Sequence, residues 1–316
     1  MTLKLNELTW PMVETLAECA DELRVTHSQV GGANVFDFGV KAAGGLQAGI
    51  ELTNLCMSGL ADITIQHSLL AGRNWPFVAV GTDHPLEACL LSQYAGWQIG
   101  TDNYFALGSG PMRVAAGVED IVNQFDAKES ADECVGILEA GELPTVEAVK
   151  LIADKTGVEP EYIALFVART SSQAGSVQIA ARSVETALHK LHELEFDVTR
   201  IESGFGSTPL SPVAKNDLEG IGRTNDSILY AGSVHLFVRG DDESIADIGP
   251  KVPSSSSSCF GKPFIEVFED AGRDFYKIDP HLFSPAQVVF QNLDTGRVQS
   301  FGELNHDIAV QSFGLS

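Results

Sequence analysis

An arginine and a glutamate, Arg182 and Glu185, stand within an otherwise small and apolar stretch of helical spacing, SVQIAARSVETALHKLHELEF at residues 176–196. Residues three positions apart lie on one face of a helix, so these two side chains are close enough to interact. Exposed pairs of this kind contribute little stability, but the apolar neighbours predict that this pair is partly buried. A buried carboxylate beside an arginine is a candidate general acid or base. Spacing alone leaves a structural ion pair and a catalytic pair equally open.

A glycine turn, GSGPMR at residues 108–113, follows a strand-like segment. The backbone of Gly108, Ser109 and Gly110 could approach a ligand closely, because glycine has no side chain. The turn is neither the dinucleotide-binding G-x-G-x-x-G, since Arg113 stands at the last glycine position, nor a P-loop. Without further support a structural turn is the better interpretation, and a ligand-binding turn is the alternative.

Polar residues also precede an apolar segment in GRTNDSILYAG, residues 222–232. Arg223, Thr224, Asn225 and Asp226 could enter a cleft and bind the edge of a heterocycle. An Asx turn is the favoured interpretation of this stretch taken alone. The eight histidines are dispersed, and the sequence contains neither H-E-x-x-H nor a cluster of cysteine and histidine. We therefore predict no metal site.

Charge and composition exclude several classes of protein. The formal net charge is -23, which repels phosphate backbones and anionic membranes, so nucleic acid is not an expected partner. No apolar run approaches the roughly 20 residues of a membrane-spanning helix, and the amino terminus lacks the pattern of a secretory signal. Five scattered cysteines argue against a disulfide framework. The chain is expected to be a soluble cytoplasmic protein.

Helical and strand-like segments alternate without strict regularity, which predicts an α+β (mixed α/β) fold with two lobes. The polar segment DAKESADE at residues 126–133 is the expected connection, so the lobes are placed at 1–126 and 127–316, with exchange of segments left open. The expected helices are 7–23, 44–57, 85–97, 145–156, 176–196 and 264–272. The expected strands are 34–40, 61–67, 75–83, 103–108, 134–138 and 162–168, with a hairpin at 286–304. Residues 227–238 are expected to form one long strand or a pair of strands.

Several stretches follow one another as they do in the methenyltetrahydromethanopterin cyclohydrolases, and the resemblance covers nearly the whole chain. They are YFALGSGPMR, SVQIAARSVETALHKL, GRTNDSILYAG, VPSSSSSCFGKPF and DFYKIDPHLFSPAQVVFQNLDTGRV. The resemblance implies two α+β lobes facing each other across a substrate groove, a homotrimer, and neither a metal nor a redox cofactor. It implies reversible hydrolysis of N5,N10-methenyltetrahydromethanopterin to the N5-formyl compound. Met112 stands where the family more often has alanine, which predicts a narrower groove.

The resemblance also assigns roles to residues. Arg182 and Glu185 match the catalytic pair of the family, with Glu185 as general acid and base and Arg182 keeping it ionised and oriented. Three residues of the glycine turn are expected to line the reaction pocket: Gly108, Ser109 and Gly110. Weaker candidates for holding the pterin or its tail are Arg223, Asn225, Asp226 and Lys262. The alternative is a pterin-binding or regulatory paralogue that binds without turnover.

Overall fold

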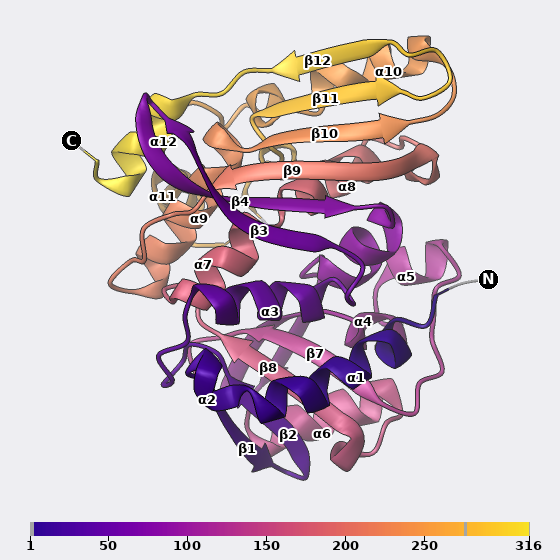
Figure 1. Cartoon of the computed structure of the whole chain (residues 1–316), viewed down its shortest axis with the longest axis vertical. Helices are drawn as coiled ribbons and strands as arrows, with labels where there is room; N and C mark the ends of the chain where they lie inside the picture. The colour runs from indigo at the N-terminus through magenta and orange to yellow at the C-terminus, as the bar shows by residue number, and fades with distance from the viewer. Residues whose placement is uncertain (1–2, 275–276, 316) are drawn as a thin grey trace. The chain divides into compact units, whose positions relative to one another are not determined.

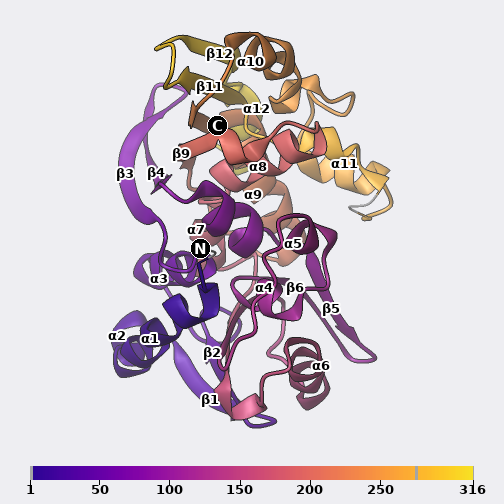
Figure 2. The same ribbon diagram turned by 90° about the vertical axis from the view of Figure 1, so that its right-hand side faces the viewer.

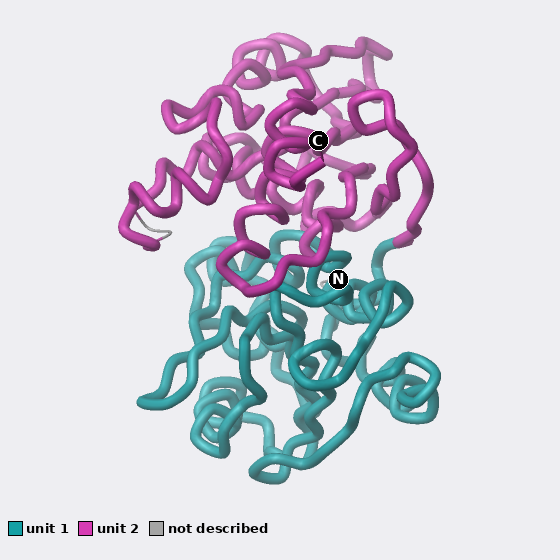
Figure 3. Tube along the Cα trace, turned by 90° about the vertical axis from the view of Figure 1, so that its left-hand side faces the viewer, with its two compact units in different colours: residues 1–61, 87–178 teal, residues 62–86, 179–316 magenta. Residues whose placement is uncertain are grey.

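The computed structural model describes residues 3–274 and 277–315. Its contacts divide the chain into two compact units (Figure 3). Unit 1 comprises Met1–Ala61 and Glu87–Gln178, and unit 2 comprises Asp62–Leu86 and Ile179–Ser316. The expected boundary after residue 126 therefore falls inside a segment of unit 1. Each unit is built around one six-stranded sheet with helices packed on it, so the predicted α+β class is confirmed.

The sheet of unit 1 has the strand order β1-β2-β8-β7-β6-β5. Its three central strands β2, β8 and β7 are parallel, and the outer strands pair antiparallel. The strands are β1 (Thr26–Val30), β2 (Ala33–Asp37), β5 (Trp97–Thr101), β6 (Tyr104–Ser109), β7 (Cys134–Glu139) and β8 (Ile163–Ala168). The helical segments are α1 (Leu5–Glu18), α2 (Ala20–Leu23), α3 (Leu46–Cys56), α4 (Met112–Ala116), α5 (Asp120–Gln124), α6 (Val146–Thr156), η2 (Pro160–Tyr162), and the π-helix η1 (Leu86–Gln93) and α7 (Gln173–Ala180), which both cross the division between the units.

Both faces of this sheet are covered by helices. Along β8, Leu165 and Val167 point into a core with α4 and α6, whereas Phe166 and its alternate neighbours point into a core with α1 and α3. This alternation is the period of two that a strand imposes on its side chains. Figure 2 shows α1 and α6 on opposite sides of the strands. A near-continuous apolar sequence is therefore required of β8, because it is buried on both faces.

The sheet of unit 2 has the strand order β12-β11-β10-β9-β4-β3, which Figure 1 shows in sequence across the sheet. All neighbours are antiparallel except β10 and β11. The strands are β3 (Asp62–Leu70), β4 (Arg73–Thr82), β9 (Ile201–Pro209), β10 (Ser233–Val238), β11 (Gln287–Asn292) and β12 (Val298–Gly302). The helical segments are α8 (Ser183–Glu193), η3 (Val198–Arg200), α9 (Asp217–Ala231), α10 (Asp242–Ile248), η4 (Gly249–Lys251), η5 (Ser254–Ser256), α11 (Phe264–Asp270), η7 (Pro280–Leu282) and α12 (His306–Phe313).

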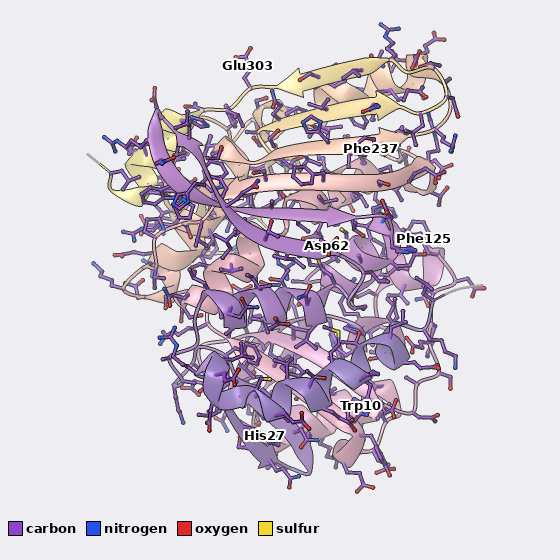
Figure 4. The ribbon with its side chains drawn as sticks, viewed as in Figure 1. Trp10, His27, Asp62, Phe125, Phe237 and Glu303 are labelled. Atoms are coloured by element: carbon purple, nitrogen blue, oxygen red, sulfur yellow. The ribbon has the colours of Figure 1, made fainter. Side chains whose placement is uncertain are left out.

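Two glycines of β9 allow α8 to approach this sheet closely. A Cβ at Gly204 would lie 2.7 Å from a methyl group of Val184, and one at Gly206 would lie 2.2 Å from the Ser183 Oγ. The first turn of α8 therefore packs directly on strand backbone. The alternate residues of β9 face the other side of the sheet, where Phe205 is 43% exposed and the neighbouring strand carries Phe237, labelled in Figure 4.

Most expected elements are confirmed, with several differences. The expected helix 7–23 is interrupted at Cys19 and forms α1 and α2, and the expected strand 34–40 ends at Asp37. The expected helix 176–196 is broken into α7 and α8, because the Arg182 amide bonds to the Ile179 carbonyl and does not continue the α-helical ladder. The expected strand 227–238 is strand only from Ser233, since its first part is the end of α9. The expected helix 85–97 ends at Gln93, and Trp97 begins β5.

Candidate active site

Arg182 and Glu185 lie at the start of α8. Arg182 occupies the N-cap position with φ -80° and ψ 3°, and the amide of Thr186 bonds to its carbonyl. Glu185 is in the first helical turn, where the amino-terminal end of the helix dipole favours a negative charge. The break between α7 and α8 therefore places a carboxylate at the end of a helix that stabilises its ionised form.

The two side chains are buried and in contact, as the sequence predicted. Arg182 is 8% exposed and Glu185 is 3% exposed, and one bond of 3.3 Å joins Nη1 of the arginine to Oε2 of the glutamate. Among the described residues, Nε of Arg182 is buried and has no hydrogen-bond partner. Buried donors in native proteins are almost always paired, so this nitrogen requires a partner such as a ligand or a water molecule.

A second buried arginine–glutamate pair, in unit 1, shows the contrast. Arg113 is fully buried and binds Glu119 through two bonds of 2.7 Å, from Nε and from Nη2. Its Nη1 donates to the Leu90 carbonyl at 2.8 Å, and its guanidinium lies 5.0 Å from the centre of the Tyr94 ring. Each nitrogen of this guanidinium has a partner, as expected of a structural ion pair. The pair at Arg182 is joined more loosely and retains an unpaired donor.

Two hydroxyl groups that the sequence analysis did not single out lie on the same side of the unit 2 sheet as the start of α8. Ser183 follows Arg182 and rests against Gly206. Thr208 is two residues further along β9 and therefore on the same face as Gly206. Both residues are fully buried, and within the described chain neither hydroxyl has a hydrogen-bond partner. The sequence signal that could have pointed to this contact is the pair of alternate glycines, Gly204 and Gly206, in ESGFGSTP. Glycines at alternate positions leave one face of a strand without side chains, so a helix can pack closely there.

The glycine turn of unit 1 is held rigidly. Gly110 has a φ of 86°, its amide donates to the Ser92 carbonyl at 2.7 Å, and the Pro111 carbonyl accepts a bond of 2.9 Å from the Asn6 side chain. Ser109 is 2% exposed, and its hydroxyl lies 3.4 Å from the Cys56 sulfur. The turn is therefore preformed, and the serine hydroxyl is directed toward α3.

Met112 does not have the effect predicted from the sequence. Its side chain is fully buried in the core shared by α4 and α6. It fills space left by two glycines, because a Cβ at Gly136 would lie 2.2 Å from the Met112 sulfur and one at Gly108 would lie 2.6 Å from its terminal methyl group. The extra volume of methionine relative to alanine is thus taken up inside unit 1, and the expected narrowing of a groove is wrong.

The remaining candidates are spread over α9 and the loop before α11. The Nη1 atom of Arg223 approaches the Val213 carbonyl at 3.4 Å, and the Asn225 amide donates to the carbonyl one turn earlier, at Ile221, at 2.8 Å. Lys262 is ion-paired with Asp270. None of these contacts joins one of the three residues to another.

Asp226 is placed in the interior of unit 2. It is fully buried, and its Oδ1 accepts a bond of 2.8 Å from the Phe264 amide at the start of α11. Burial raises its pKa to about 7. This oxygen caps the start of α11, whereas Oδ2 is buried and has no hydrogen-bond partner among the described residues.

Comparison with known proteins identifies the family. A family model described as cyclohydrolase (MCH) matches residues 4–313. The chain belongs to the cyclohydrolase (MCH) family. Methenyltetrahydromethanopterin cyclohydrolase of Methylobacillus flagellatus is 43% identical over 314 residues, covering 99% of this chain and 96% of the relative. The enzymes of the same name from Rhodopirellula baltica and Methanocella arvoryzae are 43% and 42% identical, covering 96% and 99% of this chain and 92% and 99% of the relatives.

Residues 3–274 and 277–315 contain no group of three or more histidine, cysteine, aspartate or glutamate side chains that could hold a metal ion. Across the same ranges, no helix combines the length and the apolar character needed to cross a membrane.

Proposed function

We propose that the chain is a methenyltetrahydromethanopterin cyclohydrolase and that Arg182 and Glu185 carry out its chemistry. The observation that carries this assignment of residues is the incomplete pairing of the buried Arg182 guanidinium, whose Nε lacks a partner in the described structure. A structural arginine in the same chain, Arg113, has a partner for each of its nitrogens. An unpaired buried donor beside a buried carboxylate is suited to a site that a polar ligand completes.

The residue types account for the reaction. The methenyl bridge is an amidinium-like cation, so its carbon is already electrophilic. Glu185 takes a proton from water as the water oxygen bonds to the bridge carbon. The protonated Glu185 then gives its proton to N10 as the bond from the bridge carbon to N10 breaks. The added hydroxyl loses its proton to solvent and becomes the N5-formyl carbonyl, with a net release of one proton.

Arg182 has two roles in this proposal. Its bond to Oε2 orients the carboxylate, and its charge favours the ionised form in a buried setting. That contact is 3.3 Å long, longer than the two bonds of 2.7 Å in the pair of Arg113 and Glu119. The unpaired Nε is then available for the attacking water or for a polar group of the substrate. Since the bridge cation is the electrophile, no metal or redox cofactor is required in this scheme.

Glu185→Gln tests the proposal. Glutamine keeps the size of the side chain but cannot accept the proton, so kcat should fall by about 10²- to 10⁴-fold while KM changes little. The assay follows the absorbance of the methenyl compound, and Glu119→Gln, in the saturated pair of unit 1, is the matched control that should retain kcat once folded. Wild-type turnover by Glu185→Gln would exclude the assigned role. Binding by the unaltered protein without loss of the methenyl absorbance would identify a binding paralogue.

The assembly and location are further proposals. The family resemblance predicts a homotrimer in the cytoplasm, with the pterin as small-molecule partner. Sedimentation equilibrium of the purified chain measures the assembly directly, and a monomeric mass would contradict the predicted trimer.

A further inference from the structure

The first turn of α8 carries the proposed catalytic pair but is not capped by a side chain. Its N-cap residue, Arg182, makes no capping bond, whereas α6 and α9 are capped by the side chains of Thr145 and Asn216. The bond between Arg182 and Glu185 is 3.3 Å long, so it fixes the two side chains only weakly. Their orientation therefore depends on how the backbone of this turn is held.

The turn is held by strand β9 of the unit 2 sheet. Ser183 rests on the backbone of Gly206, since a Cβ there would lie 2.2 Å from the serine Oγ. Val184 packs in the same way on Gly204. Because the helix start lies directly on strand backbone, a side chain of β9 beside this contact can act on the position of Glu185.

Thr208 is the residue that follows Gly206 on this face of β9. It is fully buried, and its neighbour on β4 is the fully buried Val78. Valine has the shape of threonine, so a hydroxyl group at this position costs stability unless it is hydrogen-bonded. Residues two apart on a strand are separated by about 6.6 Å. The Ser183 hydroxyl above Gly206 is therefore too far from Thr208 for a direct bond, but the separation is one that a water molecule can bridge.

The hydroxyl groups of Ser183 and Thr208 have no partner among the described residues, and neither has the Nε of Arg182, the residue next to Ser183. A buried hydroxyl elsewhere in the chain shows the usual arrangement, because Thr53 donates to the Gly49 carbonyl at 2.8 Å. Unpaired polar groups in the interior are costly. A buried water molecule commonly makes about three hydrogen bonds to groups of this kind, so the space between α8 and β9 has the chemistry of a water site.

We propose that Ser183 and Thr208 hold an ordered water molecule between α8 and β9, and that both are positioning residues for the pair of Arg182 and Glu185. The water has the effect that a capping side chain has elsewhere, because it ties the first turn of α8 to a strand that is paired on both sides. Neither hydroxyl group contacts the reacting atoms in this assignment. The water site rests on the contacts described above, and only its effect on turnover rests on the proposed function.

High-resolution crystal structures of the wild type and of Thr208→Val test the water site directly. The wild type should contain a water molecule within hydrogen-bond distance of both hydroxyl groups. The variant should lack it, because valine offers no polar atom. A wild-type crystal structure without a water molecule at this position overturns the proposal, whether or not the chain is a cyclohydrolase.

Urea denaturation gives a second test that is independent of activity. Thr208→Val should lower the urea midpoint, because the bridging water loses one of its partners. Removal of a hydroxyl group that is buried and dry would instead raise the midpoint. Ser183→Ala combined with Thr208→Val should lower the midpoint no further than the larger single change, since both hydroxyl groups bind the same water. A higher midpoint in Thr208→Val, or additive losses in the double variant, contradicts a shared water.

Turnover of the methenyl compound tests the positioning role. Thr208→Val should lower kcat about tenfold and leave KM within about threefold, since the pair that it positions acts on the reacting carbon. Thr208→Ser keeps the hydroxyl group and should retain the wild-type kcat. Thr53→Val, which removes a buried hydroxyl group of α3 that already has a carbonyl partner, is the matched control and should also retain it.

Wild-type kcat in Thr208→Val, or a Thr208→Ser enzyme as slow as Thr208→Val, overturns the positioning role. A wild-type chain that does not convert the methenyl compound contradicts the proposed function, and the crystal structures then decide the water site by themselves.

Discussion

Asp226 makes the stability of unit 2 depend on pH. Its pKa rises from 3.8 to about 7, mainly through burial, while the bond from the Phe264 amide lowers it and the charge of Glu266 raises it. Between about pH 4 and pH 7 the unfolded chain releases this proton and the folded chain keeps it. The contribution of Asp226 to the free energy of unfolding therefore falls as pH rises through this window and is constant above it. The total decrease is about 4 kcal/mol.

Asp226→Asn removes the titration and keeps an oxygen that can accept from the Phe264 amide. The free energy of unfolding of the variant minus that of wild type should be larger at about pH 8 than at about pH 5. The change should be about 3 kcal/mol, because each pKa unit between pH 5 and the folded pKa contributes about 1.4 kcal/mol. Asparagine stays neutral at every pH. The stability of the variant relative to wild type therefore grows as pH rises toward about 7 and is constant above it.

Urea denaturation at the two pH values, followed by circular dichroism, measures this difference. Carboxylates that are unaltered titrate equally in both proteins, so their contributions cancel. Asp247→Asn, at an exposed carboxylate of α10, is the matched control and should show no such pH-dependent change. An Asp226→Asn variant whose stability relative to wild type is equal at both pH values would refute the reasoning.

Two further substitutions test the packing around the sites. Arg113→Met should destabilise the protein by about 3–5 kcal/mol, because it leaves Glu119 charged and without its partner in the interior, and Arg113→Met with Glu119→Gln should recover part of the loss in urea midpoint. Gly206→Ala should cost about 1–3 kcal/mol by pushing a methyl group into Ser183 at the start of α8. Adding Ser183→Ala should relieve the clash, and a Gly206→Ala protein as stable as wild type would mean that α8 does not pack this closely.

The sequence alone was sufficient to predict those helices and strands for which the local signals agree. The helix α6 is an example, because Thr145 caps its start through the Ala148 amide and Gly157 ends it with a φ of 75°. Segment β8 was equally clear as a short apolar run bounded by polar residues. The strand expected at 227–238 was wrong in its first half, because the apolar residues of a helix end and of a strand form one continuous run there.

The site was only partly accessible to sequence reasoning. The spacing and surroundings of Arg182 and Glu185 predicted a buried pair, and this is what the structure has. The break before Ser183 was not predictable from propensity, since alanine and arginine both favour helices. Ser183 and Thr208 were not predicted as site residues, because the burial of their hydroxyl groups depends on contacts between α8 and β9. Such contacts cannot be inferred from a local sequence pattern. The role of Met112 likewise depended on two glycines distant in the sequence.

The interleaved segments of the two units affect how the chain emerges from the ribosome. The hairpin of β3 and β4 is complete at Thr82, but its partner β9 begins only at Ile201. Synthesis at about 5–20 residues per second leaves an open hydrogen-bonding edge on β4 for several seconds or more. During that interval the strands β5, β6, β7 and β8 of the unit 1 sheet are made, and β1 and β2 precede the hairpin. The nascent protein therefore has to shield a strand edge while its other sheet assembles, and this makes the hairpin the segment on which a chaperone holding the growing chain would act.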